Sequence, residues 1–555
     1  MNDTAFEYPL DLIITTDAHY YSPKLGIDTP SYKKYDSTNQ KAVKDSPAII
    51  SAAFAQIAES NCENVIFCGD ATCDGDYDSH VEFIELLYAL KKCGKRVFAI
   101  TSTHDYQDDG LTNCYTGDEK TKVPSAKREE LLKMYHSFGP DEAFSQFEMS
   151  YAAELDENYI LLALNSDKNG KGKSGYSSEH KAWIAKIANA AKQCNKRVIA
   201  FTHHPILSPS PVYSLIGKND MMGEHEEIKD FLADLGICLV FTGHSHVHDI
   251  SYDFSPSGNI FYDVSTSALA GYPGLYRTVR ICGSNVHIES VAITESVSGI
   301  SNLPEYLENK FIGMIDRTLD AAASDIDTFA ACVDSMSIHP NVSYRIGWFV
   351  RPFARLIKKL KLGVFARWVK SETHNADLSP AENESVFDLI RQLVLHLYSG
   401  NAPYTPDTAE YKIVIGFVNI IDSVLKLLHI KMRLSDLVRP LLYNSGIDDS
   451  NADLPLNADK KAVNAICNNK YKETVSESKK GLAVLTVLIL AIIILLPLIP
   501  VIAVALLIGA GVNEIIYRKQ IRGKYYEQSF KSRHSRRRPS LDDIRRAGKN
   551  KSRNA

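Results

Sequence analysis

The first half of the sequence predicts an α/β fold, because short apolar runs of the length of β-strands alternate with stretches of helical pattern. Between Asp11 and about Glu295, the short runs are rich in Val, Ile and Leu, which is typical of buried strands. Alternation with helices predicts a sheet with crossover connections. Three further strand-like segments, NIFYDVST, LYRTVRI and VHIESVAI, end this unit. The predicted strands are DLIITT, NVIFC, RVFAIT, YILLALN, RVIAFT and CLVFT, and the predicted helices span 47–60, 79–93, 178–194 and 224–235.

The chain, at 555 residues, is too long for a single core. Its hydrophobic share of 45% and charged share of 23% are ordinary for a globular protein, so most of it is able to fold. Its ten cysteines are scattered without a Cys-x-x-Cys pair, which favours reduced thiols in the cytosol. We divide the chain into an N-terminal domain (8–296), a mostly helical region (297–470), a hydrophobic segment (481–512) and a basic tail (513–555) that we expect to be disordered.

One segment of the helical region, residues 345–370, combines basic and aromatic side chains. It carries eight Lys or Arg residues and no acidic residue, and Phe353, Leu360 and Trp368 are among the apolar residues that recur at helical spacing. A basic amphipathic helix with an aromatic apolar face is typical of a membrane interface. The alternative is a helix that packs on the rest of the region and points its Lys and Arg side chains to water. The sequence favours neither interpretation.

The hydrophobic segment 481–512 predicts attachment to a membrane. Its 32 residues carry no charge, and as a straight helix they would extend about 48 Å across a hydrocarbon core of about 30 Å. Pro497 and Pro500 favour a break into two short arms, and hence a re-entrant hairpin rather than a single tilted span. A hairpin would keep the N-terminal domain, which has no export signal, and the basic tail in the cytoplasm. We therefore expect a membrane-associated protein with a cytoplasmic N-terminal domain.

The charge of the chain is unevenly distributed. The formal net charge is −5, but residues 513–555 contain 14 Lys or Arg against 4 Asp or Glu, a local charge of +10 that leaves −15 for the rest. A basic tail of this kind binds an anionic surface, either lipid or nucleic acid. Aromatic residues are sparse in it, so the sequence gives nucleic acid no support over lipid.

Five small clusters of Asp and His residues each follow a predicted strand. A lone Asp at a strand end is more often a turn residue, and a lone His more often an ordinary buried or surface side chain. All five in order are a strong signal, because the carboxyl ends of strands in an α/β sheet form the edge where ligands bind. The clusters are Asp17-Ala18-His19, Gly69-Asp70, Thr103-His104-Asp105, His203-His204-Pro205 and Gly243-His244-Ser245-His246.

The chemistry of these side chains favours divalent metal ions. Imidazole and carboxylate groups in this ratio suit Mn, Fe or Zn. Six or seven donors exceed the needs of one ion but would serve two ions if one carboxylate bridged them. Two metals ~3.5–4 Å apart hold a nucleophilic hydroxide and clamp the oxygens of a phosphoryl group during in-line displacement. The clusters therefore indicate a two-metal phosphoesterase.

The five motifs resemble the signature of the calcineurin-like metallophosphoesterases, which is D-x-H, G-D-x-x-D, G-N-H-D/E, H-x-P and G-H-x-H. The resemblance covers about residues 11–290 and is strongest to a bacterial subgroup related to cyclic-nucleotide phosphodiesterases. It implies two facing β-sheets flanked by helices. It also implies that His104 contacts the phosphate and protonates the leaving oxygen, oriented by Asp105. The implied metal ligands are Asp17, His19 and His246 for one ion and His203 and His244 for the other, with Asp70 bridging the two.

Two departures from the family pattern weaken the expected site. Thr103 replaces the metal-binding Asn of the third motif, and a Thr hydroxyl is a poorer neutral ligand than an amide oxygen. The second motif is one residue longer than usual before Asp74, to which we assign only a structural role. His204 and His248 are expected to be structural or substrate-facing, not ligands. The loop 271–274 resembles one that covers a site.

Three hypotheses for the function follow. The first is a hydrolase of phosphomonoesters or phosphodiesters that works at the cytoplasmic membrane surface. The second is a membrane-bound scaffold or sensor that has lost most turnover because of Thr103. The third is a nuclease that uses the basic tail to bind nucleic acid. The four His residues retained in the last three motifs favour the hydrolase, whereas the substrate, the native metal and the oligomeric state stay open.

Overall fold

The computed structural model divides the chain into two units, Met1–Ser476 and Glu477–Ala555. All of the described residues lie in the first unit, and none of their helices combines the length and the apolar composition that crossing a bilayer requires. The hydrophobic segment 481–512, the basic tail and most of 345–370 lie outside the described residues. The described residues are 8–167, 174–209, 220–334, 360–369, 373, 376–427, 434–443, 446–457 and 463.

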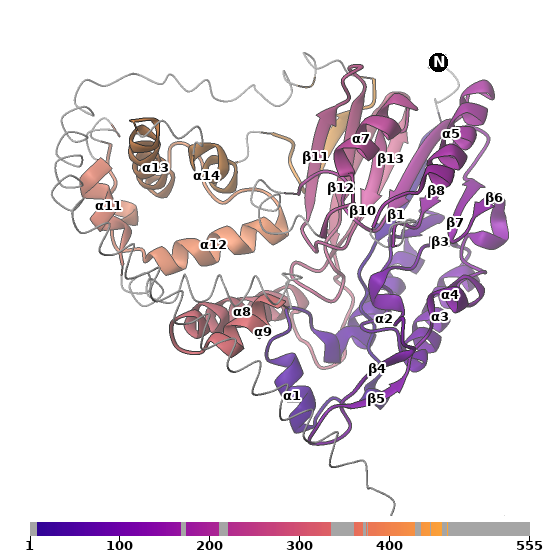
Figure 1. The fold of residues 1–555 in the computed structure, drawn as a ribbon, viewed down its shortest axis with the longest axis horizontal. Coiled ribbons are helices and arrows are strands. Elements are labelled where there is room, and N and C mark those ends of the chain that lie inside the picture. Colours follow the sequence, from indigo (N-terminus) through magenta and orange to yellow (C-terminus); the bar gives the residue numbers. More distant parts are fainter. Residues whose placement is uncertain are drawn as a thin grey trace, which may run out of the picture. The chain divides into compact units, whose positions relative to one another are not determined.

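Two β-sheets form the centre of the first unit (Figure 1). In each sheet a parallel core of strands is extended by antiparallel strands, on one side in the first sheet and on both sides in the second. The first sheet has the order β15–β14–β13–β1–β2–β3, with β1 Leu10–Thr15, β2 Asn64–Phe67, β3 Arg96–Ala99, β13 Leu275–Cys282, β14 Asn285–Ala292 and β15 Asn451–Pro455. The second has the order β11–β12–β10–β9–β8–β7–β6, with β6 Ala143–Phe147, β7 Ser150–Glu154, β8 Tyr159–Leu164, β9 Arg197–Thr202, β10 Leu239–Thr242, β11 Asp249–Phe254 and β12 Ile260–Ser265.

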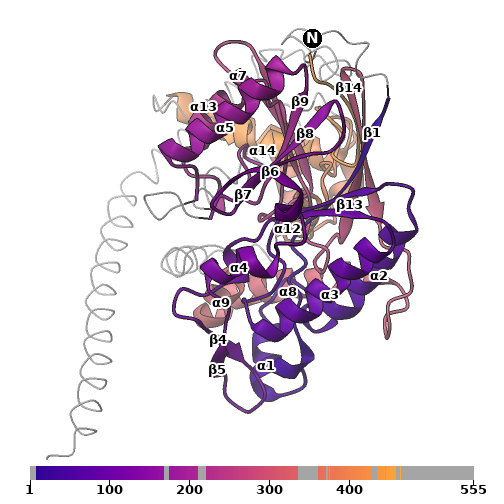
Figure 2. The ribbon, with the colours of Figure 1, turned by 90° about the vertical axis from the view of Figure 1, so that its right-hand side faces the viewer.

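The two sheets face each other across a hydrophobic core, and helices cover their outer faces. Ile14 and Phe98 of the first sheet pack in one buried cluster with Leu161 and Phe241 of the second. The alternate residues of the same strands point outward, where α2 and α3 cover the first sheet and α5 and α7 the second (Figure 2). The expected pair of facing sheets flanked by helices is therefore present. The helices here are α1 Pro30–Asp36, α2 Ser46–Glu59, α3 Tyr77–Lys92, α4 Arg128–Met134, α5 Ser178–Gln193 and α7 His225–Asp234.

The four predicted helices of this domain are confirmed as α2, α3, α5 and α7, and the capping residues explain two of their starts. The side chains of Asp76 and Ser177 accept the amides of Ser79 and His180 and so begin α3 and α5. The predicted strands are also present. Strands that the sequence did not reveal are β6, β7, β11 and the hairpin of β4 (Leu111–Cys114) and β5 (Thr121–Pro124), several of which are half-exposed and lack an apolar run.

The region after residue 297 is mostly helical, as predicted. Its α11 tests part of the segment 345–370: Leu362, Ala366 and Val369 are buried in a cluster with residues of α12 and α13, whereas Trp368 is 54% exposed. For these residues the structure agrees with a helix packed on its own region. The helices are α8 Leu303–Ser324, α9 Ile326–Asp334, α11 Leu362–Val369, α12 Val386–Ser399, α13 Ala409–Leu427 and α14 Leu434–Leu442.

The helical region ends in a strand that returns to the first sheet, which the sequence did not predict. β15 pairs antiparallel with β14, the strand that precedes the helical region. Just before β15, the carboxylate of Asp449 accepts the amides of Ile250 and Asn401, both at 2.9 Å. The buried guanidinium of Arg277 donates to the carbonyl of Asp449 at 2.7 Å. The helical region is therefore joined to the sheet domain at both of its ends.

Candidate metal centre

The loops after four strands bring the predicted ligands together at one edge of the sheets. Asp17 and His19 follow β1, Asp70 follows β2, His203 follows β9, and a last pair follows β10. Five of these residues have left-handed backbone conformations, which cost about 1–2 kcal/mol for residues other than glycine and cluster at functional sites. They are Asp17 (φ 50°), His19 (φ 43°), Asp70 (φ 53°), His244 (φ 64°) and His246 (φ 57°).

One group of three buried side chains converges after β1 and β10. The Nε2 atoms of His19 and His246 lie 2.9 Å apart, and 3.4 and 3.2 Å from Oδ1 of Asp17. Oδ2 of Asp17 accepts the hydroxyl of Thr16 and the amide of His244, whereas Oδ1 faces the two imidazole nitrogens. A buried carboxylate oxygen that faces two imidazole nitrogens fits a divalent cation between the three groups.

A second group consists of Asp70, His203 and His244. Nε2 of His203 lies 3.1 Å from Oδ2 of Asp70 and 3.1 Å from Nδ1 of His244. The other ring nitrogen of His203, Nδ1, is 2.8 Å from the carbonyl of Cys68, which only accepts, so Nδ1 carries a proton. Burial lowers the pKa of His203, but the charges of Asp70 and Asp17 outweigh it and raise the pKa to about 10. A cation in place of the Nε2 proton would lie beside the carboxylate of Asp70 and the ring of His244, and an imidazole fixed by a carbonyl is the usual outer arrangement of a metal ligand.

Asp70 lies between the two groups. Besides its place beside His203 and His244, it forms a third candidate ligand set with His19 and His104, all of whose ligand atoms lie within 4.8 Å of one another. Burial raises the pKa of Asp70, but the positive charges of His203 and His104 outweigh it and hold the pKa well below its usual range. Asp70 is therefore an ionised carboxylate in the position of a bridging ligand.

Comparison with known proteins agrees with this geometry. Residues 10–248 match the family model of the calcineurin-like phosphoesterases. The matched residues make up less than half of the chain, and the match supports a phosphoric ester hydrolase. The predicted family resemblance is confirmed for these residues, whereas the bacterial subgroup stays a prediction. No curated protein matches the chain.

Solved structures with a similar chain course include three phosphatases or nucleotidases. A dimetal phosphatase from Danio rerio is 13% identical, with a TM-score of 0.37 over 52% of this chain and 97% of the other. A purple acid phosphatase from Lupinus luteus seeds is 11% identical, with a TM-score of 0.33 over 52% and 53%. An NAD nucleotidase from Haemophilus influenzae is 11% identical, with a TM-score of 0.27 over 64% and 62%.

In the metallophosphoesterase domain, His104 is held differently from the expectation. Its Nδ1 donates to the carbonyl of Cys73 at 2.7 Å, and Oδ1 of Asp74 lies 3.7 Å from the same nitrogen. The carboxylate of Asp105 instead accepts the backbone amides of Thr72 and Ser102, both at 2.8 Å. Burial, together with the charge of Asp70, raises the pKa of Asp105 to about 7. Asp105 therefore shapes the two loops around the centre, and the ring of His104 is oriented by Cys73.

The third motif contains a carboxylate contact that the sequence did not reveal. Thr103 is exposed, and the hydroxyl of Ser102 donates to Oδ1 of Asp167 at 2.7 Å. Asp167 is 6% exposed, and burial raises its pKa to about 6. It belongs to none of the three candidate ligand sets among the described residues. We therefore assign it to the support of the third motif and not to the ligands.

His204 and His248 lie beside the ligands, as expected of structural residues. Nδ1 of His204 is 2.9 Å from the hydroxyl of Ser166, and burial together with the charge of His203 lowers the pKa of His204 to about 3. Nε2 of His248 is 2.6 Å from the hydroxyl of Ser290. Neither residue belongs to a candidate ligand set among the described residues.

Two polar residues at the centre, Gln40 and Lys41, were missed. Nε2 of Gln40 lies 2.8 Å from Nδ1 of His246, and Nζ of Lys41 lies 3.3 Å from Nδ1 of His19. Both residues are buried, with exposures of 7% and 6%. They belong to a loop between predicted elements, and no motif or spacing in the sequence marks them.

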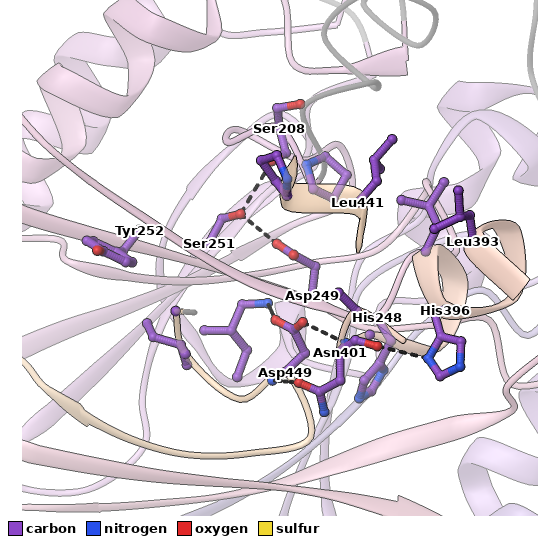
Figure 3. Close-up of a pocket in the computed structure, with 18 residues that line it drawn as sticks. Ser208, His248, Asp249, Ser251, Tyr252, Leu393, His396, Asn401, Leu441 and Asp449 are labelled. Carbon is purple, nitrogen blue, oxygen red and sulfur yellow. Dashed lines mark hydrogen bonds between the residues drawn. The ribbon is translucent and has the colours of Figure 1, made fainter. Parts of the chain in front are cut away.

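A pocket of about 390 Å³ lies apart from the ligands (Figure 3). It is bordered by the start of β11 and by α12 and α14, and the carboxylate of Asp249 and the ring of His396 are among its polar walls. None of the predicted ligands lines it. One of the residues that line the pocket is His248, which lies two residues after the candidate ligand His246. The helical region therefore reaches the immediate neighbourhood of the centre.

Proposed function

We propose that the protein hydrolyses phosphomonoesters or phosphodiesters with two divalent cations held by the six predicted ligands. The observation that carries the proposal is that Oδ1 of buried Asp17 faces Nε2 of His19 and of His246. The second group, which contains Asp70, lies next to it, and a third set joins Asp70 to His19. Manganese, iron and zinc all suit this set of donors. Bound there, two such ions supply Lewis acidity and a water of lowered pKa.

The residues of the chain provide the remaining functions. Asp70 keeps a negative charge between the two groups and, by accepting the amide of His104 at 3.1 Å, fixes the start of the third motif beside them. Because Nδ1 of His104 donates to Cys73, Nε2 of the same ring is left for the substrate. His104 is therefore placed to hold and deliver a proton to the leaving oxygen.

The test is metal-dependent turnover by the purified full-length protein. We expect hydrolysis of p-nitrophenyl phosphate or bis-p-nitrophenyl phosphate in the presence of Mn²⁺, loss of activity after treatment with a chelator, and recovery when metal is returned. Including single-stranded DNA as a third substrate tests the nuclease hypothesis. Absence of turnover on every substrate with Mn²⁺, Fe²⁺ and Zn²⁺ would contradict the proposal and favour the scaffold or sensor.

We further propose that the protein works at the cytoplasmic face of a membrane, attached through 481–512. The support is the run of 32 uncharged residues followed by a tail of local charge +10. We expect the full chain to float with phosphatidylcholine vesicles in a density gradient even in high salt, and a chain without residues 477–555 to stay at the bottom. Flotation of the shortened chain would place the attachment elsewhere, and release of the full chain by salt would leave only an electrostatic contact.

A further inference from the structure

Lys41 is a buried cation that faces the metal centre without an acidic partner. Its side chain is 6% exposed, and among the described residues it forms no ion pair with a carboxylate. Its polar contact is Nδ1 of His19, 3.3 Å from Nζ. A buried ammonium is costly unless an anion meets it, so this position calls for a negative group.

The backbone around Lys41 is fixed firmly enough to aim the side chain. Its amide donates to the side chain of Asn39 at 2.9 Å, and the amide of Ala42 donates to the carbonyl of Ala270 at 2.7 Å. Lys41 also forms an isolated antiparallel bridge with Gly271, in the loop 271–274. The backbone of Lys41 is therefore fixed by contacts with a second loop, and its position does not depend on the contact with His19.

The contact with His19 is incompatible with a metal-loaded centre. The ammonium only donates, so Nδ1 of His19 is the acceptor in this contact and, in a neutral ring, the proton is on Nε2. Nε2 is the atom that faces Asp17 and His246. A ring that binds a cation through Nε2 carries its proton on Nδ1, and an N–H group there cannot accept from Lys41. In the loaded centre Nζ is therefore free for another acceptor.

We propose that this acceptor is a non-bridging oxygen of the substrate phosphate, and that Lys41 makes the centre prefer phosphomonoesters to phosphodiesters. The proposal rests on the proposed function of the same site. A monoester near neutral pH carries close to two negative charges and a diester one, because the second ionisation of a phosphate has a pKa of about 6. A buried ammonium gains more from the larger charge, and the hydrogen bond between two charged groups is strong.

The experiment compares Lys41→Met, Lys41→Arg and Lys44→Met in the full-length protein. Lys44 is a control from the same segment, because its side chain is 45% exposed and pairs with Asp28. We would measure kcat/KM for p-nitrophenyl phosphate and for bis-p-nitrophenyl phosphate, inhibition by inorganic phosphate, and bound Mn²⁺ per chain. For Lys41→Met we expect the monoester value to fall by roughly 10- to 100-fold more than the diester value, which is what a charge-assisted hydrogen bond is worth.

For Lys41→Met we also expect weaker inhibition by inorganic phosphate and unchanged bound Mn²⁺. Lys41→Arg is expected to show an intermediate loss, and Lys44→Met is expected to behave like the wild type. Equal losses on both substrates, or a loss that follows a change in bound Mn²⁺, would overturn the proposal and make Lys41 a residue that acts on His19. If Lys41→Met fails to fold, Lys41→Arg decides, because an unchanged substrate ratio and unchanged phosphate inhibition there would also overturn it. A wild type inactive on both substrates would instead refute the proposed function.

Discussion

Replacing Asp70 by Asn is expected to lower kcat/KM for either nitrophenyl ester by at least about a thousandfold, a loss of about 4 kcal/mol of transition-state stabilisation. The change keeps the shape of the side chain and removes the charge shared by the two ligand groups. Asp70 is 1% exposed and lies within reach of His203, His244, His19 and His104. Bound Mn²⁺ is expected to fall with activity, and both are measured on the purified protein with metal analysis beside the kinetics.

The matched control for this change is Asp78→Asn. Asp78 lies on α3, its side chain is 51% exposed, and it pairs with Lys24, so its loss removes a surface charge of the kind worth little to stability. We expect wild-type turnover and metal content from it. An Asp70→Asn protein that is folded by circular dichroism and retains both metal and activity would refute the assignment of Asp70 as a bridging ligand.

Replacing His104 by Asn is expected to lower kcat by about 10²- to 10⁴-fold for an ester with a poor leaving group, which is the usual worth of general acid–base catalysis. The loss depends on the ester, because an alkoxide needs a proton in order to leave and a nitrophenolate scarcely does. A series of alkyl and aryl phosphates measures this directly: the variant's rate is expected to depend more steeply on the leaving group than the wild type's. His104 lies beside the candidate ligands His19 and Asp70, so metal content is measured in parallel.

The control for His104 is His136→Asn, at an exposed histidine. It is expected to leave the rate and its dependence on the leaving group unchanged. Equal losses for alkyl and nitrophenyl esters in the His104→Asn protein would contradict its role as the proton donor. Such a result with reduced metal would place His104 among the ligands.

The strand ends were predictable because two independent patterns coincide there. Apolar runs such as LIITT and VIFC predict strands that are buried on both faces, and each run is followed directly by an Asp or His motif. The structure then places Asp17 and Asp70 after neighbouring parallel strands of one sheet, and His203 after a strand of the other. The facing of two sheets was accessible only through the family resemblance, because alternation of strands and helices alone does not distinguish one sheet from two.

The supporting residues could not be predicted, because local sequence does not specify which way a loop side chain points. His104 and Asp105 are adjacent in the chain, but within the short turn Thr103–Asp105 the ring points to Cys73 and the carboxylate to backbone amides of two loops. Lys41 contacts His19 from a loop that lies 22 residues after His19 in the chain. The bridge of Lys41 to Gly271 and the bond of Ala42 to Ala270 depend on strands that pair from opposite ends of the domain.

The return of the chain through β15 determines how the helical region is able to move. Its entrance follows β14 and its exit leads into β15, and these strands are hydrogen-bonded neighbours. A region attached by a single linker swings freely. A region whose two ends lead into adjacent hydrogen-bonded strands forms a closed loop and is confined to small shifts about this pair of strands. The pair of strands is also linked through Asp449 to Ile250, four residues beyond His246. The helical region is thereby connected by a hydrogen bond to the backbone near a candidate metal ligand.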